Sequence, residues 1–383
     1  MSLFKKIFSP ICLTLSIFFF IYVFFKSQIY WNGEKNSYYQ IYFIISLILI
    51  IFSILTFYLN QKTKEYVIII LVSAIAALYI FEIYITFNQI KSKDQRIKKQ
   101  INIKQKKFME KTGDKFDIRS RYEIYSDLKR EDSDIQVTFH SSDIMTKKNN
   151  IFSFAGISKS KTINCNENGY YSIYESDRYG FNNPDNEWDS KEIEYLLVGD
   201  SFAHGYCVNR PYDISSVLRK LSNKSALNLG YGNNGPLIEY AVLREYLNPN
   251  VKKVLWIYFE GNDLDDLSSE KKNKILINYL NDLNFSQNLK MRQNEINNLE
   301  IEIETKYKLI NLQLNNTKII SNKESIKVIQ KETKNFFKLQ NLRDRLHYYL
   351  IKRYFDYDQR LKNFEKILRL TKDFTIKNNS ELY

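Results

Sequence analysis

The hydrophobic and polar positions divide the chain into an apolar N-terminal part and a mostly polar remainder. Residues 7–25 and 41–59 contain no charged side chain, and the apolar run 66–87 contains only Glu82. Each run has about the 20 helical residues that cross a hydrocarbon core, where a helix satisfies its own backbone hydrogen bonds. The pattern predicts three transmembrane helices within residues 1–90, and therefore a lipid bilayer as a partner of this chain.

The first run has a second interpretation, because Lys5 and Lys6 precede it as basic residues precede the apolar part of a cleaved signal peptide. A signal peptide ends in a small-x-small cleavage site, and no such site follows Phe25. We therefore interpret the first run as a retained helix.

Basic residues flank the predicted helices on both sides. The two sides carry Lys5, Lys6, Lys62 and Lys64 against Lys26, Lys35 and the basic run 91–107. This count alone favours a cytoplasmic C-terminal domain, but long domains translocate largely regardless of charge. The basic run is interpreted as a collar at the membrane surface and not as a nucleic-acid site, because it directly follows a helix and carries no nucleic-acid fold signature.

The polar remainder changes character near residue 191. Residues 91–190 are predicted to form a basic linker and a small mixed region with short strands. Three short apolar runs then alternate with amphipathic, helix-forming segments; the runs are 193–198, 225–229 and 252–259, and the segments 211–221 and 236–247. This alternation predicts an α/β domain with a parallel sheet over residues 191–383.

Polar residues and glycine follow the end of each predicted strand. Ser201, Gly230 and Asn262 all come just after a strand, and parallel sheets bind ligands beyond the carboxyl ends of their strands. A serine hydroxyl there suits a nucleophile, and the N–H of Ser201, the N–H of Gly230 and the amide of Asn262 suit an oxyanion hole. The alternative for each is ordinary: a helix N-cap, a turn glycine and a turn-forming asparagine. Their occurrence at three consecutive strand ends favours function.

The composition of the chain also points to the loops after the predicted strands as the functional region. The chain has 383 residues, a formal net charge of +13, 11 glycines, 5 prolines and 3 cysteines. These contents exclude collagen-like, Pro/Gly-rich disordered and disulfide-framework proteins. Six of the eleven glycines lie between Gly199 and Gly261, so we expect the chemistry there. No metal-ligand spacing is found between residues 91 and 190, and nothing in the chain requires a metal or an organic cofactor.

The cysteines leave the compartment open. Cys12 lies in the first predicted helix, so Cys165 and Cys207 are the only pair available to the polar domain. They could form a disulfide in the periplasm and are expected to be free thiols in the cytoplasm.

Three motifs together resemble a known family. Gly199-Asp200-Ser201-Phe202, Asn228-Leu229-Gly230-Tyr231-Gly232 and Gly261-Asn262-Asp263 are similar to blocks I, II and III of the SGNH/GDSL hydrolases. The resemblance implies a three-layer α/β domain with Ser201 as nucleophile and Gly230 and Asn262 as oxyanion donors. Upstream, Tyr179-Gly180-Phe181-Asn182 is similar to the lead-in of membrane-linked members of bacterial polysaccharide pathways. Such members act on ester-linked acyl groups, commonly acetyl groups on sugars.

The family's fourth element is an Asp-x-x-His motif that supplies the catalytic base. Asp344 and His347 match its letters, but they lie within residues 336–357, which are predicted to form a long helix, so we interpret them as helical and not catalytic. His204 is expected near the site without a role as base, and His140 at the surface. Because residues 380–383 resemble the start of a strand, the sequence is expected to be a fragment that lacks the histidine loop.

These expectations lead to two hypotheses. The first is a serine esterase or O-acyltransferase in the bacterial inner membrane, whose periplasmic domain acts on an acylated glycan. The second is a non-catalytic SGNH-like protein that binds or assembles glycans. A helical insertion is predicted at about 270–350, with an apolar stripe expected to pack within the chain: Ile296, Leu299, Ile303, Tyr307, Ile310 and Leu314. The oligomeric state stays open.

Overall fold

The computed structural model describes residues 2–33, 36–139, 150–316, 333–345 and 348–383. The chain forms two compact units. The helical unit comprises residues 1–98 and 322–359, and the sheet unit comprises residues 99–321 and 360–383. The region 99–190, predicted as a linker and a separate lead-in, therefore belongs to the same unit as the parallel sheet.

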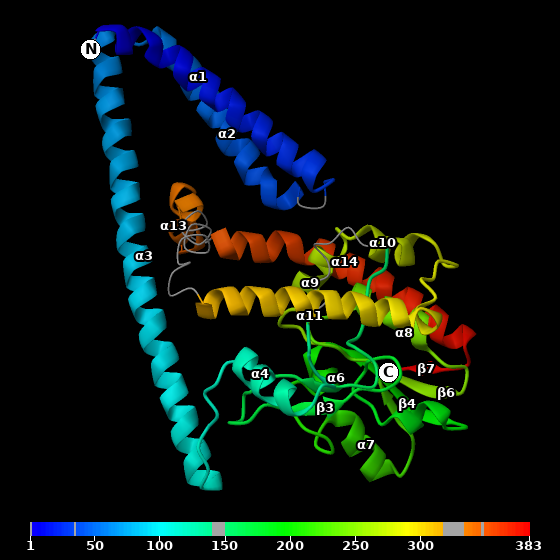
Figure 1. The fold of residues 1–383 in the computed structure, drawn as a ribbon. Helices are drawn as coiled ribbons and strands as arrows, with labels where there is room; N and C mark the ends of the chain where they lie inside the picture. The colour runs from blue at the N-terminus through cyan, green and yellow to red at the C-terminus, as the bar shows by residue number, and fades with distance from the viewer. Residues whose placement is uncertain (1, 34–35, 140–149, 317–332, 346–347) are drawn as a thin grey trace. The chain divides into compact units, whose positions relative to one another are not determined.

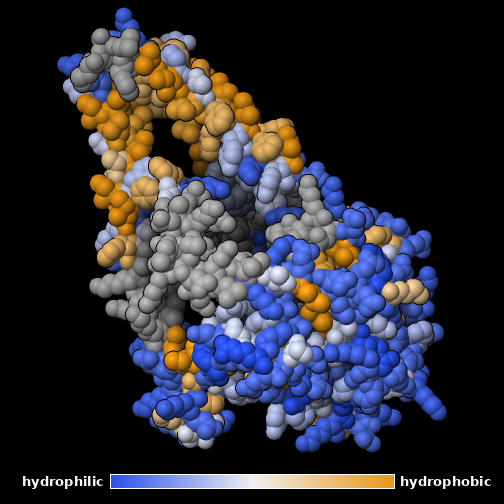
Figure 2. Space-filling view, viewed as in Figure 1, coloured by the Kyte–Doolittle hydropathy of each residue, from blue (hydrophilic) through white to orange (hydrophobic). Residues whose placement is uncertain are grey.

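The helical unit contains the three predicted apolar helices (Figure 1). Helix α1 (Ser2–Phe24) continues into a short π-helix (Phe25–Tyr30) and pairs with α2 (Asn36–Tyr58). The pair is held by a 2.9 Å hydrogen bond between the hydroxyls of Ser16 and Ser53 and by the Ser9 hydroxyl, which donates to the Thr56 carbonyl at 3.1 Å. Three stretches are long and apolar enough to cross a membrane, namely Lys6–Tyr30, Tyr38–Tyr58 and Gln61–Asn88. Figure 2 shows orange surface on these helices and mostly blue surface on the sheet unit.

Helix α3 (Gln61–Thr112) continues well beyond the third apolar stretch. The basic run 91–107, predicted as part of a linker, is helical throughout. Lysine, glutamine and arginine favour helices, and the segment from 61 to 112 contains neither glycine nor proline. The helix ends at the next glycine after this segment, Gly113, which has φ +78°. Its N–H donates to the Met109 carbonyl at 2.9 Å.

A carboxylate near the end of the third apolar stretch, that of Glu82, caps another helix of the same unit. Glu82 is fully buried and accepts hydrogen bonds from the backbone N–H groups of Asn341 at 2.9 Å and Leu342 at 2.7 Å. These residues lie in the first turn of α13 (Gln340–Arg345), where N–H groups have no acceptor within the helix. The carboxyl group of Glu82, within an apolar helix, thus holds the first turn of α13.

The sheet unit is built on a parallel sheet in the strand order β5-β4-β6-β7. Its strands are β4 (Ile193–Gly199), β5 (Ala226–Asn228), β6 (Val251–Ile257) and β7 (Glu381–Leu382). In the register, Leu197 pairs with Asn228 on one side and with Leu255 on the other. The first three strands and the parallel α/β sheet were predicted from the apolar runs, and the structure confirms them.

The strand order creates a switch point between β4 and β6. From β4 the chain passes to β5 on one side through α6 (Ser201–His204) and α7 (Ile214–Ser222). It then returns through α8 (Pro236–Tyr246) to β6 on the other side of β4. Loops at the carboxyl ends of two strands diverge at such a point and leave room for a ligand. The loops after β4 and β6 carry Ser201 and Asn262.

The lead-in region adds a small second sheet to the same unit. It consists of β1 (Ile135–Val137), β2 (Lys161–Ile163) and β3 (Ile173–Glu175), preceded by α4 (Arg121–Glu131). A disulfide joins Cys165, between β2 and β3, to Cys207, just after α6, with the two Cα atoms 4.8 Å apart. The lead-in region is therefore tied covalently to the segment that follows Ser201.

Helices after β6 complete the core. They are α9 (Asp263–Glu270), α10 (Lys274–Asn281), a short 3₁₀ turn (Leu289–Met291), α11 (Gln293–Asn316) and α14 (Tyr348–Lys377). Ile296, Leu299 and Ile303 of α11 are buried in the core, which confirms that the predicted stripe packs within the chain at these three positions. A 3₁₀ turn (Asp185–Asp189) precedes β4.

Candidate active site

Ser201 lies at the point where the central strand turns into a helix. It is the first residue of α6, and the preceding Asp200 caps that helix by accepting the Phe202 N–H at 2.9 Å. The turn depends on Gly199, because a Cβ there would lie 2.8 Å from the Ile257 carbonyl oxygen and 2.9 Å from the Ala203 Cβ. Ser201 is partly exposed, and its N–H is at a helix position without an intrahelical acceptor.

The hydroxyl of Ser201 faces a carboxylate. Its Oγ donates to Asp200 Oδ2 at 3.4 Å, a long and therefore weak hydrogen bond. Asp200 is 1% exposed, and burial raises the pKa of its carboxyl above the usual value. The arrangement orients the serine hydroxyl beside a group able to accept a proton.

The loop after β5 packs directly on α6. A Cβ at Gly230 would lie 2.4 Å from the Ala203 Cβ and 2.7 Å from the backbone N of His204, so no other residue fits without a shift of the backbone. The Gly230 N–H donates to Asn228 Oδ1 at 2.8 Å, and Asn228 Nδ2 donates to the Ala203 carbonyl at 2.6 Å. Gly230 is thus beside the serine helix as predicted, but its N–H already has an acceptor, so a role in an oxyanion hole requires Asn228 to release it.

Asn262 lies at the N-cap position of α9, five residues beyond β6. Its Nδ2 donates to Asp266 Oδ2 at 2.7 Å, so this predicted donor is also engaged within the protein. Its Oδ1 is buried and accepts no hydrogen bond from the residues that the structure describes. The loops after β4 and β6 meet through Phe202 and Phe259, whose ring centroids are 5.0 Å apart and which are 54% and 39% exposed.

Buried carboxyl groups lie behind the loop after β6. Burial raises the pKa of Asp263 to about 7 and that of Asp266 to about 6, with the nearby charge of Asp200 as a further cause for both. The pKa of Glu270 is raised to about 8, again chiefly by burial, although its oxygens accept the N–H groups of Gly235 at 2.6 Å and Leu237 at 3.0 Å.

A further carboxyl on α8 belongs to this group. Glu239 accepts Trp256 Nε1–H at 2.5 Å, and burial, then the charge of Asp263, raises its pKa well above the usual value. Sequence reasoning missed these carboxyls. The sequence shows acidic residues on two amphipathic helices, but it does not show which of these residues face the interior, because that is determined by packing.

The lead-in motif supports the site from behind. The Asn182 side chain donates to the His204 carbonyl at 3.0 Å. The side-chain amide of Asn183 accepts the Asn228 N–H at 2.7 Å and donates to the Asn228 carbonyl at 2.9 Å. It thus forms with Asn228 of β5 the pair of hydrogen bonds that the backbone of an adjacent strand would form. Gly180 has φ +87° and lies so close to the Gly156 backbone that a side chain would clash.

Of the three histidines, the structure describes His204 alone, and no hydrogen bond between His204 and Ser201 is found among the described residues. Asp344 lies in α13, as the helical interpretation predicted, and His347 and His140 lie outside the described residues. His204 is fully buried, with its ring 4.7 Å from that of Tyr231 and 5.3 Å from that of Tyr174. The ring is part of an aromatic core cluster.

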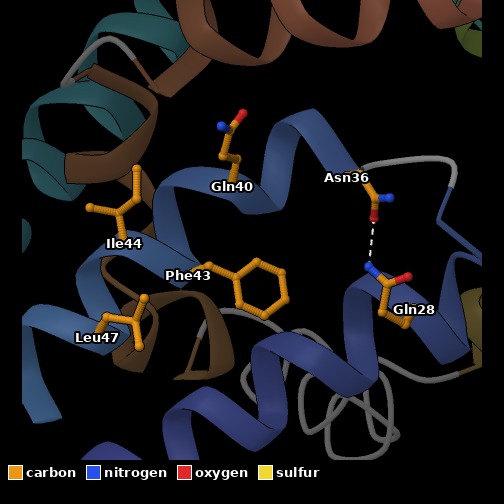
Figure 3. Close-up of a pocket in the computed structure, with 6 residues that line it drawn as sticks. All are labelled: Gln28, Asn36, Gln40, Phe43, Ile44 and Leu47. Carbon is orange, nitrogen blue, oxygen red and sulfur yellow. Dashed lines mark hydrogen bonds between the residues drawn. The ribbon is translucent and has the colours of Figure 1, made fainter.

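A cavity of about 360 Å³ lies in the helical unit. It is lined by Gln28 of the π-helix and by residues of α2, and Gln28 donates to Asn36 at 2.8 Å (Figure 3). It belongs to the apolar helices and not to the loops around Ser201. Within the described residues, no group of three His, Cys, Asp or Glu side chains is arranged to hold a metal ion. Comparisons of the whole chain with protein-family models, with curated proteins and with solved structures find no match.

Proposed function

We propose that the sheet unit is a serine esterase or O-acyltransferase acting on ester-linked acyl groups, acetyl above all, of a bacterial surface polysaccharide. The observation that carries the proposal is the position of Ser201 at the N-terminus of α6, directly after the central strand and at the switch point of the sheet. The Gly230 loop packed against the same helix adds support.

The chemistry follows from this position. The Ser201 oxygen attacks the ester carbonyl, its proton leaves to a base, and the carbonyl oxygen gains negative charge that N–H donors stabilise. The sugar leaves as an alcohol, and the acyl-serine is then attacked by water in hydrolysis or by another hydroxyl in transfer. Asp200 is the carboxylate in contact with the serine hydroxyl in the described residues, and it would hold that hydroxyl oriented. Phe202, the residue after Ser201, presents an exposed ring that contacts the exposed ring of Phe259, and these rings would offer an apolar surface to an acyl group.

The fold behind this proposal is the three-layer SGNH arrangement. It is supported by the order β5-β4-β6-β7, in which the first strand is central and later strands add on one side, as in doubly wound sheets of the flavodoxin type. In this arrangement Ser201, Gly230 and Asn262 follow the first, second and third strands.

A second function is favoured by a specific observation. The Gly230 N–H and the Asn262 amide both bond within the protein, and the His204 ring lies among aromatic residues. A site whose donors are already engaged suits a protein that binds or assembles an acylated glycan without cleaving it. Binding without turnover separates this function from the first.

We place the sheet unit in the periplasm, attached to the inner membrane by three helices. The proposal is supported by the Cys165–Cys207 disulfide, because structural disulfides persist in oxidising compartments. An alkaline phosphatase fused after Asn183 should be active. Activity from a cytoplasm-only fluorescent reporter at the same position, instead, would assign the unit to the cytoplasm.

The test of catalysis uses the full chain in detergent micelles with p-nitrophenyl acetate and an acetylated glycan. Ser201→Ala should abolish ester cleavage while expression and membrane insertion are unchanged, since the partly exposed hydroxyl is no part of the core. Ser269→Ala, at an exposed serine of α9, is the matched control and should keep full activity. Turnover retained by Ser201→Ala refutes the nucleophile. Glycan binding by a wild-type protein that cleaves neither ester supports the second function.

A further inference from the structure

Helix α7 turns most of its apolar side chains toward solvent. Ile214, Val217 and Leu221 are 39%, 38% and 79% exposed, and Leu218 is half-buried. The residues it buries are Ser215 and Ser216. A surface helix of a soluble domain normally has the reverse pattern.

The inward polar face is anchored by hydrogen bonds. Asp213 caps the helix, accepting the Ser216 N–H at 3.0 Å and the Ser215 hydroxyl at 2.5 Å. Arg219 donates to the Ala226 carbonyl, at the start of β5, at 2.6 Å and to the Ser216 hydroxyl at 2.8 Å. Turning the helix over would leave these buried polar groups without partners, which costs more than exposing apolar side chains. The orientation is therefore specified by the sequence.

The outward face is continuous with other exposed residues. Tyr212, two residues before the helix, is 77% exposed and extends the apolar surface. Lys220 and Lys224 are exposed at its C-terminal end. A cluster of large apolar side chains facing solvent, with a polar rim, marks a surface that another phase or molecule covers.

We infer that this face, formed by Tyr212, Ile214, Val217 and Leu221, docks on the surface of the lipid bilayer. The helix has nine residues and is about 13 Å long, far less than the roughly 800 Å² and 20 or more residues that each partner of a stable protein interface contributes. A lipid surface needs no such area here, because the apolar helices of the same chain keep the bilayer at a high effective concentration. The two lysines complement anionic headgroups, and a tyrosine suits the interface. The inference does not depend on catalysis by Ser201.

The experiment places a nitroxide spin label on the full chain in lipid nanodiscs containing phosphatidylglycerol. Cys12→Ser removes the free thiol, and the disulfide keeps Cys165 and Cys207 unreactive under oxidising conditions. Labels at Leu221→Cys and at the control Leu283→Cys, which is 67% exposed between α10 and the following turn, are compared by power saturation with oxygen and with a nickel chelate.

The Leu221 label should be accessible to oxygen and protected from nickel, and the Leu283 label should show the reverse. Val217→Glu should return the Leu221 label to water, whereas Met291→Glu, at a 91% exposed residue, should not. Exchange of Lys220 and Lys224 for glutamine should reduce the depth of the Leu221 label. A Leu221 label that is fully accessible to nickel in the wild-type background overturns the inference. So does spin–spin broadening that disappears on dilution with unlabelled protein, because the face would then be covered by a second copy.

Discussion

Gly230 is the position at which the packing of the candidate site can be tested most directly. In Gly230→Ala the new Cβ would lie 2.4 Å from the Ala203 Cβ and 2.7 Å from both the Ala203 carbonyl carbon and the His204 nitrogen. Because two of these atoms are backbone of α6, no side-chain rotation relieves the clash, and the helix that carries Ser201 must move. Overpacking of this kind costs about 1–3 kcal/mol, and the fixed backbone puts the expected value near 3.

Gly261→Ala is the matched control. Its Cβ would approach only the ring of Phe259, at 2.5 Å, and that ring is partly exposed and able to swing away. Thermal unfolding of the full chain in micelles, followed by tryptophan fluorescence in a Trp31→Phe background, reports on Trp188 and Trp256 of the sheet unit. At about 2–4 °C per kcal/mol for a unit of this size, Gly230→Ala should lower the midpoint by roughly 6–12 °C and Gly261→Ala by little. Equal midpoints for the two variants would refute the close approach of the β5 loop to α6.

The disulfide, the buried Glu82 and the protonated carboxyls each lead to a measurable expectation. Reduction of Cys165–Cys207, at a sequence separation of 42, should destabilise the sheet unit by about 4 kcal/mol on a chain-entropy estimate; a midpoint unchanged by reductant contradicts this. Glu82→Ala should weaken α13 by about 1 kcal/mol, seen as faster amide exchange at residues 340–345, and Glu82→Gln should weaken it less. Stability should fall as pH rises from about 4 to 8 and then level off, because over this range the folded unit keeps protons on Asp263, with a pKa of about 7, and Glu270, with a pKa of about 8, that the unfolded chain has already lost. Asp263→Asn should flatten that dependence, and a flat wild-type profile would contradict the assignment.

The parallel sheet was predictable because its strands leave a strong local signal. Leu196, Leu197 and Val198 are buried, and such continuous apolar runs are typical of strands covered on both faces. The three apolar helices were predictable for the same reason, since length and hydropathy are local properties. The order of the strands could not be predicted in this way. It depends on the chain passing to both sides of β4, which no local sequence pattern indicates.

What the sequence could not predict depends on partners far apart in the chain. The amphipathic pattern predicted the α7 helix correctly, but its orientation depends on the hydrogen bond from Arg219 to the Ala226 carbonyl, which the pattern does not contain. The length of α3 was missed because charge was taken to mark a linker, although lysine and glutamine are good helix formers. The position of Gly230 was anticipated, but the acceptor of its N–H was not, because Asn228 two residues earlier looked like part of the strand alone.

The engaged state of the Gly230 N–H, which favours the binding function, is also compatible with catalysis. Asn228 is fully buried, so releasing the Gly230 N–H takes a hydrogen bond from the Asn228 Oδ1 without replacing it, which costs about 1–3 kcal/mol. A donor to a developing oxyanion is worth about 3–4 kcal/mol. Exchanging the first bond for the second therefore ranges from neutral to favourable by about 3 kcal/mol when the negative charge develops, and it is unfavourable before then. A site built in this way would stabilise the transition state more than the ground state, and that difference is what accelerates a reaction. The deciding element between the two functions is thus the base that takes the Ser201 proton.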